Sequence, residues 1–347
     1  MPKKVFIGMS GGVDSSVTAA ILKEQGYDVV GVYMKNWTRD IPGFVCPWED
    51  DYRDAKRTAV KLGIDLIVFD FEKKYKQKVV DYMVDEYKTG RTPNPDIMCN
   101  QEIKFKLFLQ TSLENGADLI ATGHYSRIKN KKLYTAKDKN KDQSYFLYRV
   151  TEDALSKSLM PVGDFKSKDE VRKLAKKFGL PTADKKDSQG ICFVGQVGIK
   201  EFLRQYVKTE PGPIVDNSLS SEGRVIGEHD GAIFYTIGQR HGLNVGGGLP
   251  YYVSKKDMKT NTVYVTTDLN DKNLWSRTIR LSDPHWINEQ PDEDKKYRAR
   301  LRYRGPLVEC RINSEKLLLD EEQRAIAAGQ SAVIYDGDQV LGGGIIR

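Results

Sequence analysis

The sequence GMSGGVDSS, from Gly8 to Ser16, separates a short apolar run from an amphipathic segment, and it decides the fold of the first part of the chain. The run KVFIGM at 4–9 predicts a β-strand. After the glycines, Val13, Val17 and Ile21 recur at helical spacing. The expected unit is therefore a strand, a tight loop and a helix.

The loop itself predicts a phosphate site. Gly11 and Gly12 allow backbone N–H groups to converge, and the following helix adds its positive end. A loop of the type GxxxxGK[ST] would need a lysine, but none occurs between Lys4 and Lys23. Asp14 is a candidate ligand for Mg²⁺ bound with the phosphates. We therefore expect ATP and its Mg²⁺ as cofactors, with a plain glycine turn as the alternative interpretation.

Further strands are expected at 28–34, 64–70 and 117–124, and a helical pattern lies at 52–62. Strands that alternate with helices predict a parallel sheet with helices on both faces. Ligands of such sheets bind at the carboxyl ends of the strands. The residues expected to contact ATP are Gly8, Met9, Ser10, Gly11, Gly12, Val13, Asp14, Ser15, Met34 and Gly123.

The pattern changes near residue 205, where short β-like segments such as AIFYTIG and NTVYVTTD alternate with glycine-rich turns. We expect an α/β fold whose doubly wound parallel-sheet domain covers residues 1–204. A small central β-rich domain would follow at 205–272. A β-barrel would complete the chain at 273–347.

Composition narrows the classes of protein. The chain has 347 residues and a formal net charge of +7, which permits a polyanionic partner such as nucleic acid but does not require one. No apolar stretch approaches the ~20 residues that a membrane span needs, and no signal peptide is recognisable. We expect a cytoplasmic protein without a membrane partner. The scattered cysteines and histidines predict no protein-bound metal site.

Two cysteines lie in polar loops. Cys99 belongs to GRTPNPDIMCNQEIKF at 90–105, and Cys192 belongs to KKDSQGICFVG at 185–195, where lysines would favour a thiolate. A lone cysteine is more often a small buried apolar side chain. We give that interpretation to Cys46 and Cys310 and expect a chemical role for Cys99 and Cys192.

These two motifs, together with YTIGQRHGL at 235–243, resemble the tRNA-specific 2-thiouridylase family of PP-loop ATP pyrophosphatases. The resemblance implies ATP-dependent 2-thiolation of the wobble uridine of tRNA, with release of AMP and pyrophosphate. It implies that Cys192 carries a persulfide, and that Cys99 is its catalytic partner in a later disulfide. Asp96 would be an acid–base candidate. Sulfur would come from an external donor, either a cysteine desulfurase or a sulfur-relay protein.

The resemblance also implies contacts with tRNA. A base that reacts at its edge must leave the stack. The resemblance assigns Asn94, Pro95 and Asp96 to this flipped-out base. The residues so implied are Asn94, Pro95, Asp96, His124, Lys141, Asp142, Gln143, Arg302, Tyr303 and Gln330.

The segment KYRARLRYR at 296–304 alternates strictly, which predicts a strand with Arg298, Arg300, Arg302 and Arg304 on one face. Such a face would suit phosphate contacts. A solvated outer face of a barrel explains the pattern equally well.

Two other functions remain open at this stage. A related PP-loop enzyme would use ammonia or an amino acid as the nucleophile, and it would need no paired cysteines. A non-catalytic tRNA-binding or nucleotide-binding protein would hold ATP without cleaving it. Neither alternative explains why two cysteines lie in glycine- and proline-bounded loops.

Overall fold

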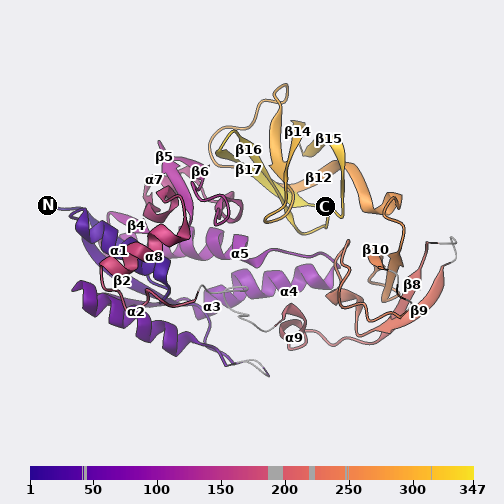
Figure 1. Cartoon of the computed structure of the whole chain (residues 1–347), viewed down its shortest axis with the longest axis horizontal. Coiled ribbons are helices and arrows are strands. Elements are labelled where there is room, and N and C mark those ends of the chain that lie inside the picture. The colour runs from indigo at the N-terminus through magenta and orange to yellow at the C-terminus, as the bar shows by residue number, and fades with distance from the viewer. Residues whose placement is uncertain are drawn as a thin grey trace.

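The computed structural model describes residues 1–40, 42, 45–186, 198–218, 223–246, 248, 250–313 and 315–347. These residues form three β-sheets. The parallel sheet and its helices lie at one end of an elongated molecule, a four-stranded sheet lies at the other end, and a barrel lies between them on one side (Figure 1).

The parallel sheet has the strand order β3-β2-β1-β4-β7. Its strands are β1 (Lys4–Gly8), β2 (Asp28–Lys35), β3 (Leu66–Asp70), β4 (Leu119–Ala121) and β7 (Ser158–Leu159). All of their pairings are parallel. The four strands expected from the sequence are confirmed, although the last is shorter than its apolar run.

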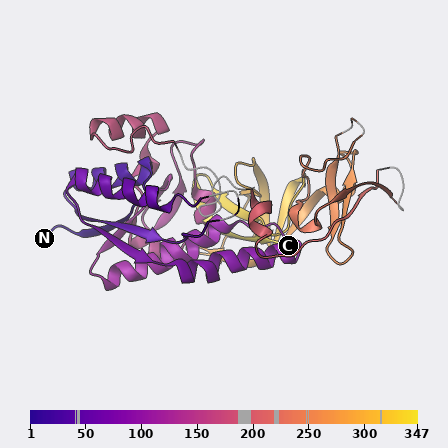
Figure 2. The same ribbon diagram turned by 90° about the horizontal axis from the view of Figure 1, so that it is seen from below.

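Helices cover both faces of this sheet, as expected for a doubly wound fold (Figure 2). Val5 and Ile7 pack with residues of α1 (Val13–Glu24) and α2 (Trp48–Leu62). Phe6 faces the opposite side and joins a larger core. Each fully buried side chain of this kind contributes about 1.5–3 kcal/mol to stability. Successive side chains of β1 therefore pack against helices on opposite faces of the sheet.

The segments between β3 and β4 supply that second layer. They are α3 (Glu72–Tyr75), π-helix η1 (Lys76–Val80), α4 (Asp81–Lys88), α5 (Pro95–Met98), π-helix η2 (Cys99–Leu107) and α6 (Phe108–Glu114). The chain then forms β5 (Ser126–Lys129), β6 (Lys132–Thr135), η3 (Ser144–Leu147), α7 (Glu152–Ser156), η4 (Pro161–Asp164), α8 (Lys168–Lys177) and α9 (Ile199–Leu203).

The four-stranded sheet has the order β10-β11-β8-β9. It consists of β8 (Gly212–Asp216), β9 (Arg224–His229), β10 (Tyr252–Asp257) and β11 (Thr262–Thr266). The segment NTVYVTTD is a strand, as expected. AIFYTIG is not, because its start forms the 3₁₀ turn η5 (Ala232–Phe234). Gly231 at φ 144° and Gly238 at φ 82° bound this segment and turn the chain away from an extended path.

The last strands close into a barrel. They are β12 (Trp275–Trp286), β13 (Tyr297–Arg300), β14 (Leu307–Asn313), β15 (Lys316–Arg324), β16 (Ser331–Asp336) and β17 (Gln339–Ile346), with η6 (Lys272–Leu274) before them. Closure occurs because the long strand β12 pairs with both β15 and β17. The hairpin β5–β6 extends the same sheet, since Val340 pairs with Leu133.

The expected four-arginine strand face is wrong. Strand β13 ends at Arg300, and residues 301–304 form a turn in which Arg304 has φ 58°. The alternating pattern continues past the strand because the chain must reverse here to begin β14. Of the two arginines on the strand, Arg298 donates to the carbonyl of Gly337, and Arg300 lies 3.4 Å from the carboxylate of Asp142.

Candidate active site

Gly11 sets the path of the phosphate loop. Its φ of +71° lies in the left-handed region, and a Cβ built there would lie 2.3 Å from the carbonyl oxygen of Asp51 on α2. The next residue, Gly12, caps α1 without any side-chain hydrogen bond. Glycine at position 11 is therefore needed both for its conformation and for close packing against a second helix.

Serine hydroxyls hold the loop in shape. The Ser15 hydroxyl donates to the carbonyl of Gly12 at 3.1 Å, and it accepts from the backbone N–H of Ser10 at 3.3 Å. Ser15 is buried, whereas Ser10 is exposed at the mouth of the loop. Met9 and Val13 are also buried, so only their backbone groups can face a ligand.

The strand-end residues expected at the ATP site converge on this loop. A Cβ at Gly8 would lie 2.8 Å from the terminal carbon of Met34. A Cβ at Gly123 would lie 2.8 Å from the backbone nitrogen of Ser15. A side chain at either glycine would overlap these atoms, so Gly8 lies against Met34 and Gly123 lies against the start of α1.

Asp14 has two partners that the sequence did not indicate. The ammonium of Lys168 lies 2.7 Å from both carboxylate oxygens of Asp14, and the hydroxyl of Tyr125 donates to one of them at 2.7 Å. The SKDE pattern at 167–170 signals a helix start, and Ser167 does cap α8 by accepting from Glu170. That local signal does not say where Lys168 points.

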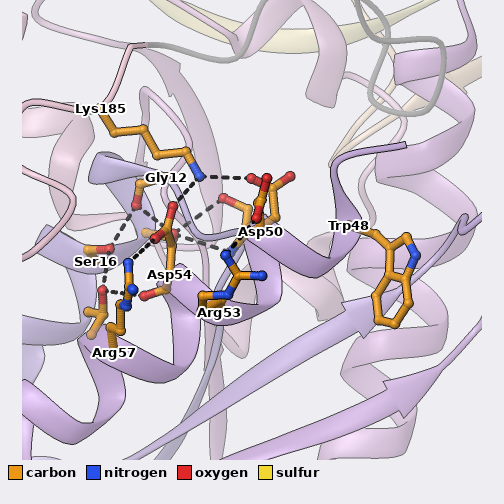
Figure 3. A network of polar contacts seen from close by, with 12 residues as sticks. Gly12, Ser16, Trp48, Asp50, Arg53, Asp54, Arg57 and Lys185 are labelled. Atoms are coloured by element: carbon orange, nitrogen blue, oxygen red, sulfur yellow. Dashed lines mark hydrogen bonds and ion pairs between the residues drawn. The ribbon is translucent and has the colours of Figure 1, made fainter. Parts of the chain in front are cut away.

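Lys185, near the end of the described range 45–186, forms ion pairs with α2. Its ammonium lies 2.8 Å from Asp51 and 2.6 Å from Asp54, in the polar network drawn beside the loop in Figure 3. The guanidinium of Arg172 donates to the carbonyls of Ala183 and Lys185. Lys185 was expected to favour a thiolate at Cys192, but here two carboxylates balance its charge. Cys192 itself lies outside the described residues.

The segment 94–99, which ends at Cys99, begins with a capped helical turn. The side chain of Asn94 accepts from the backbone N–H of Asp96 at 3.2 Å, and Pro95 occupies the first position of α5. This combination favours a helix start. Asn94 and Asp96 are half-buried, while Cys99 is only 1% exposed. The segment therefore carries two half-buried polar side chains and a buried thiol.

Thr92 anchors this segment to two other parts of the molecule. Its backbone carbonyl accepts from the side-chain amide of Gln330 at 2.7 Å, and its N–H donates to the carbonyl of Ala328 at 2.8 Å. Its hydroxyl lies 3.1 Å from that of Thr236. Gln330 was expected to contact tRNA, and in the structure its amide supports the segment before Asn94.

His124 follows the end of β4 and is buried. Its Nδ1 lies 2.8 Å from the hydroxyl of Thr122, and its Nε2 lies 3.4 Å from the ammonium of Lys104. Burial, assisted by the charge of Lys104, lowers the pKa of His124 well below its usual value. The imidazole is therefore neutral at physiological pH and next to a cation.

The other residues expected at tRNA differ in accessibility. The carboxylate of Asp142 is buried and accepts from the backbone of Ala136 and Ser144, which fixes the loop. The carbonyl oxygen of the Gln143 side chain accepts from the backbone of Tyr125 at 2.9 Å, and Lys141 is half-buried.

On the barrel, the exposed Arg302 adjoins Tyr303, whose ring lies 4.3 Å from that of Phe146. Tyr303 therefore packs on the first domain, and Arg302 is left at the surface beside it. Of the two, Arg302 is exposed, whereas Tyr303 is half-buried.

The remaining cysteines differ from each other. Cys310 is fully buried in the barrel, and desolvation raises its pKa to about 12, as the apolar interpretation predicts. Cys46 is half-buried, and desolvation also raises its pKa. The described residues contain no group of three or more His, Cys, Asp or Glu side chains that could hold a metal ion. Within the described part, every helix is too short or too polar to cross a membrane.

Three family models match the chain. Residues 3–196 match a model described as a tRNA methyl transferase HUP domain, and residues 200–267 match a tRNA methyl transferase PRC-barrel domain. Residues 276–346 match an aminomethyltransferase beta-barrel domain. The models therefore cover the parallel-sheet domain, the four-stranded sheet and the barrel in turn.

Full-length relatives are similar over nearly the whole chain. The tRNA-specific 2-thiouridylase MnmA of Methylobacillus flagellatus is 46% identical, over 100% of this chain and 99% of the relative. The protein of that name from Geobacillus thermodenitrificans is 44% identical, over 99% of this chain and 94% of the relative. A solved 4-thiouridine synthetase–RNA complex with bound ATP overlaps 58% of this chain and 50% of its own, at 19% identity and a TM-score of 0.38. The identity and coverage of the full-length relatives show that this chain belongs to the tRNA-specific 2-thiouridylase family.

Proposed function

We propose that the protein uses ATP to replace the C2 oxygen of the wobble uridine of tRNA with sulfur. One observation carries the proposal: Cys99 packs into the same buried core as Phe6 of β1 and Ile120 of β4. Those two strands lead directly to the phosphate loop and to Gly123. The same core residues thus support the Cys99 thiol and the phosphate loop.

In the first step, the C2 oxygen of uridine attacks the α-phosphorus of ATP, and the bond to the β-phosphate breaks. The products are an O2-adenylyl uridine and pyrophosphate. Backbone N–H groups at the start of α1 suit the phosphates, and Asp14 suits Mg²⁺, which is commonly bound by one or two carboxylates together with phosphate oxygens. Adenylation turns a poor leaving oxygen into a good one.

In the second step, the terminal sulfur of a persulfide on Cys192 attacks C2, and AMP leaves with the original oxygen. The Cys99 thiolate then attacks the Cys192 sulfur, which breaks the S–S bond, releases 2-thiouridine and leaves a Cys99–Cys192 disulfide. An external thiol reductant must supply two electrons to restore both cysteines. The persulfide itself would come from a cysteine desulfurase or a sulfur-relay protein, in the cytoplasm.

For tRNA, we propose that Asn94, Pro95 and Asp96 receive the flipped base. His124 would lie at the same site. Lys141, Gln143, Arg302 and Tyr303 would contact the anticodon stem-loop, while Asp142 would act by fixing its loop. We also propose that the catalytic, central and barrel domains cover residues 1–204, 205–272 and 273–347.

A comparison of Cys192→Ser with the wild type tests the proposal, using unmodified tRNA, ATP, Mg²⁺ and a persulfide source. Both proteins should release pyrophosphate in the presence of tRNA, because adenylation precedes sulfur transfer, but only the wild type should form 2-thiouridine. Full tRNA modification by the variant would favour a PP-loop enzyme with another nucleophile. No tRNA-dependent AMP from the wild type would favour a protein that only binds its ligands.

A further inference from the structure

Lys168 is the first residue of α8, yet its side chain lies at the phosphate loop on α1. The ammonium is 2.7 Å from both carboxylate oxygens of Asp14, and the Lys168 side chain is only 12% exposed, against 30% for Asp14. This cation comes from a helix far away in the sequence. Its ammonium places a positive charge beside a loop whose own sequence, Gly8 to Ser16, contains no lysine.

Several contacts aim the lysine at this place. The backbone N–H of Lys168 donates to the buried carboxylate of Asp138 at 3.1 Å, which fixes the start of α8. The ammonium lies 5.5 Å from the centre of the Tyr125 ring, and the hydroxyl of the same tyrosine donates to Asp14. The lysine is thus positioned by its backbone, by an aromatic face and by its carboxylate partner.

A purely structural ion pair would explain these contacts only in part. Helix α8 already packs on α1 through Val17, Val171 and Ala175, so the ion pair is not needed to hold the two helices together. The ion pair lies at the start of α1, beside the phosphate loop, and packing of the two helices does not require it there. Asp14 lies in the first turn of α1, next to the backbone N–H of Ser15 that closely approaches Gly123.

We propose that Lys168 is a phosphate-binding residue of the adenylation step, an inference that rests on the proposed function. In this account Asp14 holds the ammonium while the loop is empty. When ATP binds, the ammonium passes to the phosphate oxygens of the leaving pyrophosphate. As the bond between the α- and β-phosphates breaks, negative charge grows on pyrophosphate, and a fixed cation stabilises that charge.

The test compares Lys168→Met with Lys173→Met, which removes an exposed lysine from the same helix. Affinity for a non-cleavable ATP analogue is measured by titration calorimetry, and tRNA-dependent AMP formation is measured separately. Lys168→Met should bind the analogue more weakly and lower the rate of AMP formation by about 10²–10³-fold, a typical effect of removing one charge-stabilising donor. Lys173→Met should match the wild type in both measurements.

Two further variants separate binding from folding. Lys168→Arg keeps the charge and should recover part of the analogue affinity. The double variant Asp14→Asn with Lys168→Met removes the unpaired carboxylate, so it should recover thermal stability without recovering affinity or AMP formation.

The inference would be overturned if Lys168→Met kept the affinity of Lys173→Met, or if the double variant regained wild-type AMP formation. A wild-type protein that bound the analogue but formed no AMP with tRNA would instead contradict the proposed function. The calorimetric comparison would still decide the role of Lys168.

Discussion

The side-chain amide of Gln330, at the edge of the barrel, donates a hydrogen bond of 2.7 Å to the backbone carbonyl of Thr92. Thr92 lies just before Asn94 and Asp96, which are both half-buried. The barrel therefore supports the segment expected to receive the target base. We therefore predict that Gln330 acts on the site through the Thr92 backbone.

Replacing Gln330 with alanine should lower kcat for thiolation by about fivefold, because one hydrogen bond contributes roughly 1 kcal/mol and Asn94 would lose its support. The Kd for tRNA should change little. Steady-state kinetics and filter binding provide the two measurements. A Kd that rises while kcat stays constant would make Gln330 a tRNA contact instead.

Arg302 should behave in the opposite way, since its side chain is exposed on the barrel. Arg302→Gln should weaken tRNA binding and reduce the slope of log Kd against log salt by about one, as expected for one lost phosphate contact. At saturating tRNA, kcat should match the wild type. An unchanged salt slope would argue against contact with the phosphate backbone.

Gly11→Ala should abolish ATP binding. The new Cβ would lie 2.3 Å from the carbonyl of Asp51, so the loop and α2 would have to separate. Gly26→Ala is a matched control, because Gly26 also has positive φ, at +85°, but nothing lies within 4 Å of its Cβ position. Both variants should lose about 1–2 kcal/mol of stability from the left-handed conformation. Equal ATP affinity in the two would contradict the close-packing argument.

His124 should make the protein less stable in acid. Its pKa is lowered in the folded state, so below the usual value near 6.5 the unfolded chain binds a proton more readily. The stability it contributes is complete above that value and is lost as the pH falls. Burial lowers the pKa values of His229 and His285 in the same direction.

Urea unfolding at pH 7.5 and pH 5.5 measures this dependence. His124→Gln should reduce the loss of unfolding free energy between the two pH values by about 1 kcal/mol. The exposed His241 provides the control, since His241→Gln should leave the loss as large as in the wild type. An unchanged loss in His124→Gln would mean that His124 does not titrate differently on folding.

Local sequence patterns predicted the parts of the fold that depend on local interactions. The strand, the loop and α1 follow from a short apolar run, from apolar residues at helical spacing and from glycines whose conformation other residues avoid. The same reasoning failed at Arg302 and Arg304, because a chain reversal ends the strand while the alternation continues. It failed again at Ala232–Phe234, where flanking glycines turn an apolar segment that looks like a strand.

Long-range contacts could not be predicted from one sequence. Nothing near Lys168 identifies Asp14 as its partner, and nothing in the hairpin β5–β6 indicates that it extends the barrel sheet. Both contacts depend on how separate domains and helices pack. The proximity of the candidate ATP residues was easier to predict, because parallel strands bring their carboxyl ends to one edge.

The central claim is that the C2 oxygen of uridine is adenylated before sulfur replaces it. Transcribed tRNA that carries ¹⁸O at uridine C2 can be incubated with the protein, ATP, Mg²⁺ and a persulfide source, and both products can be analysed by mass spectrometry. The account predicts 2-thiouridine without the label and AMP with one ¹⁸O atom. Unlabelled AMP accompanied by 2-thiouridine would contradict it.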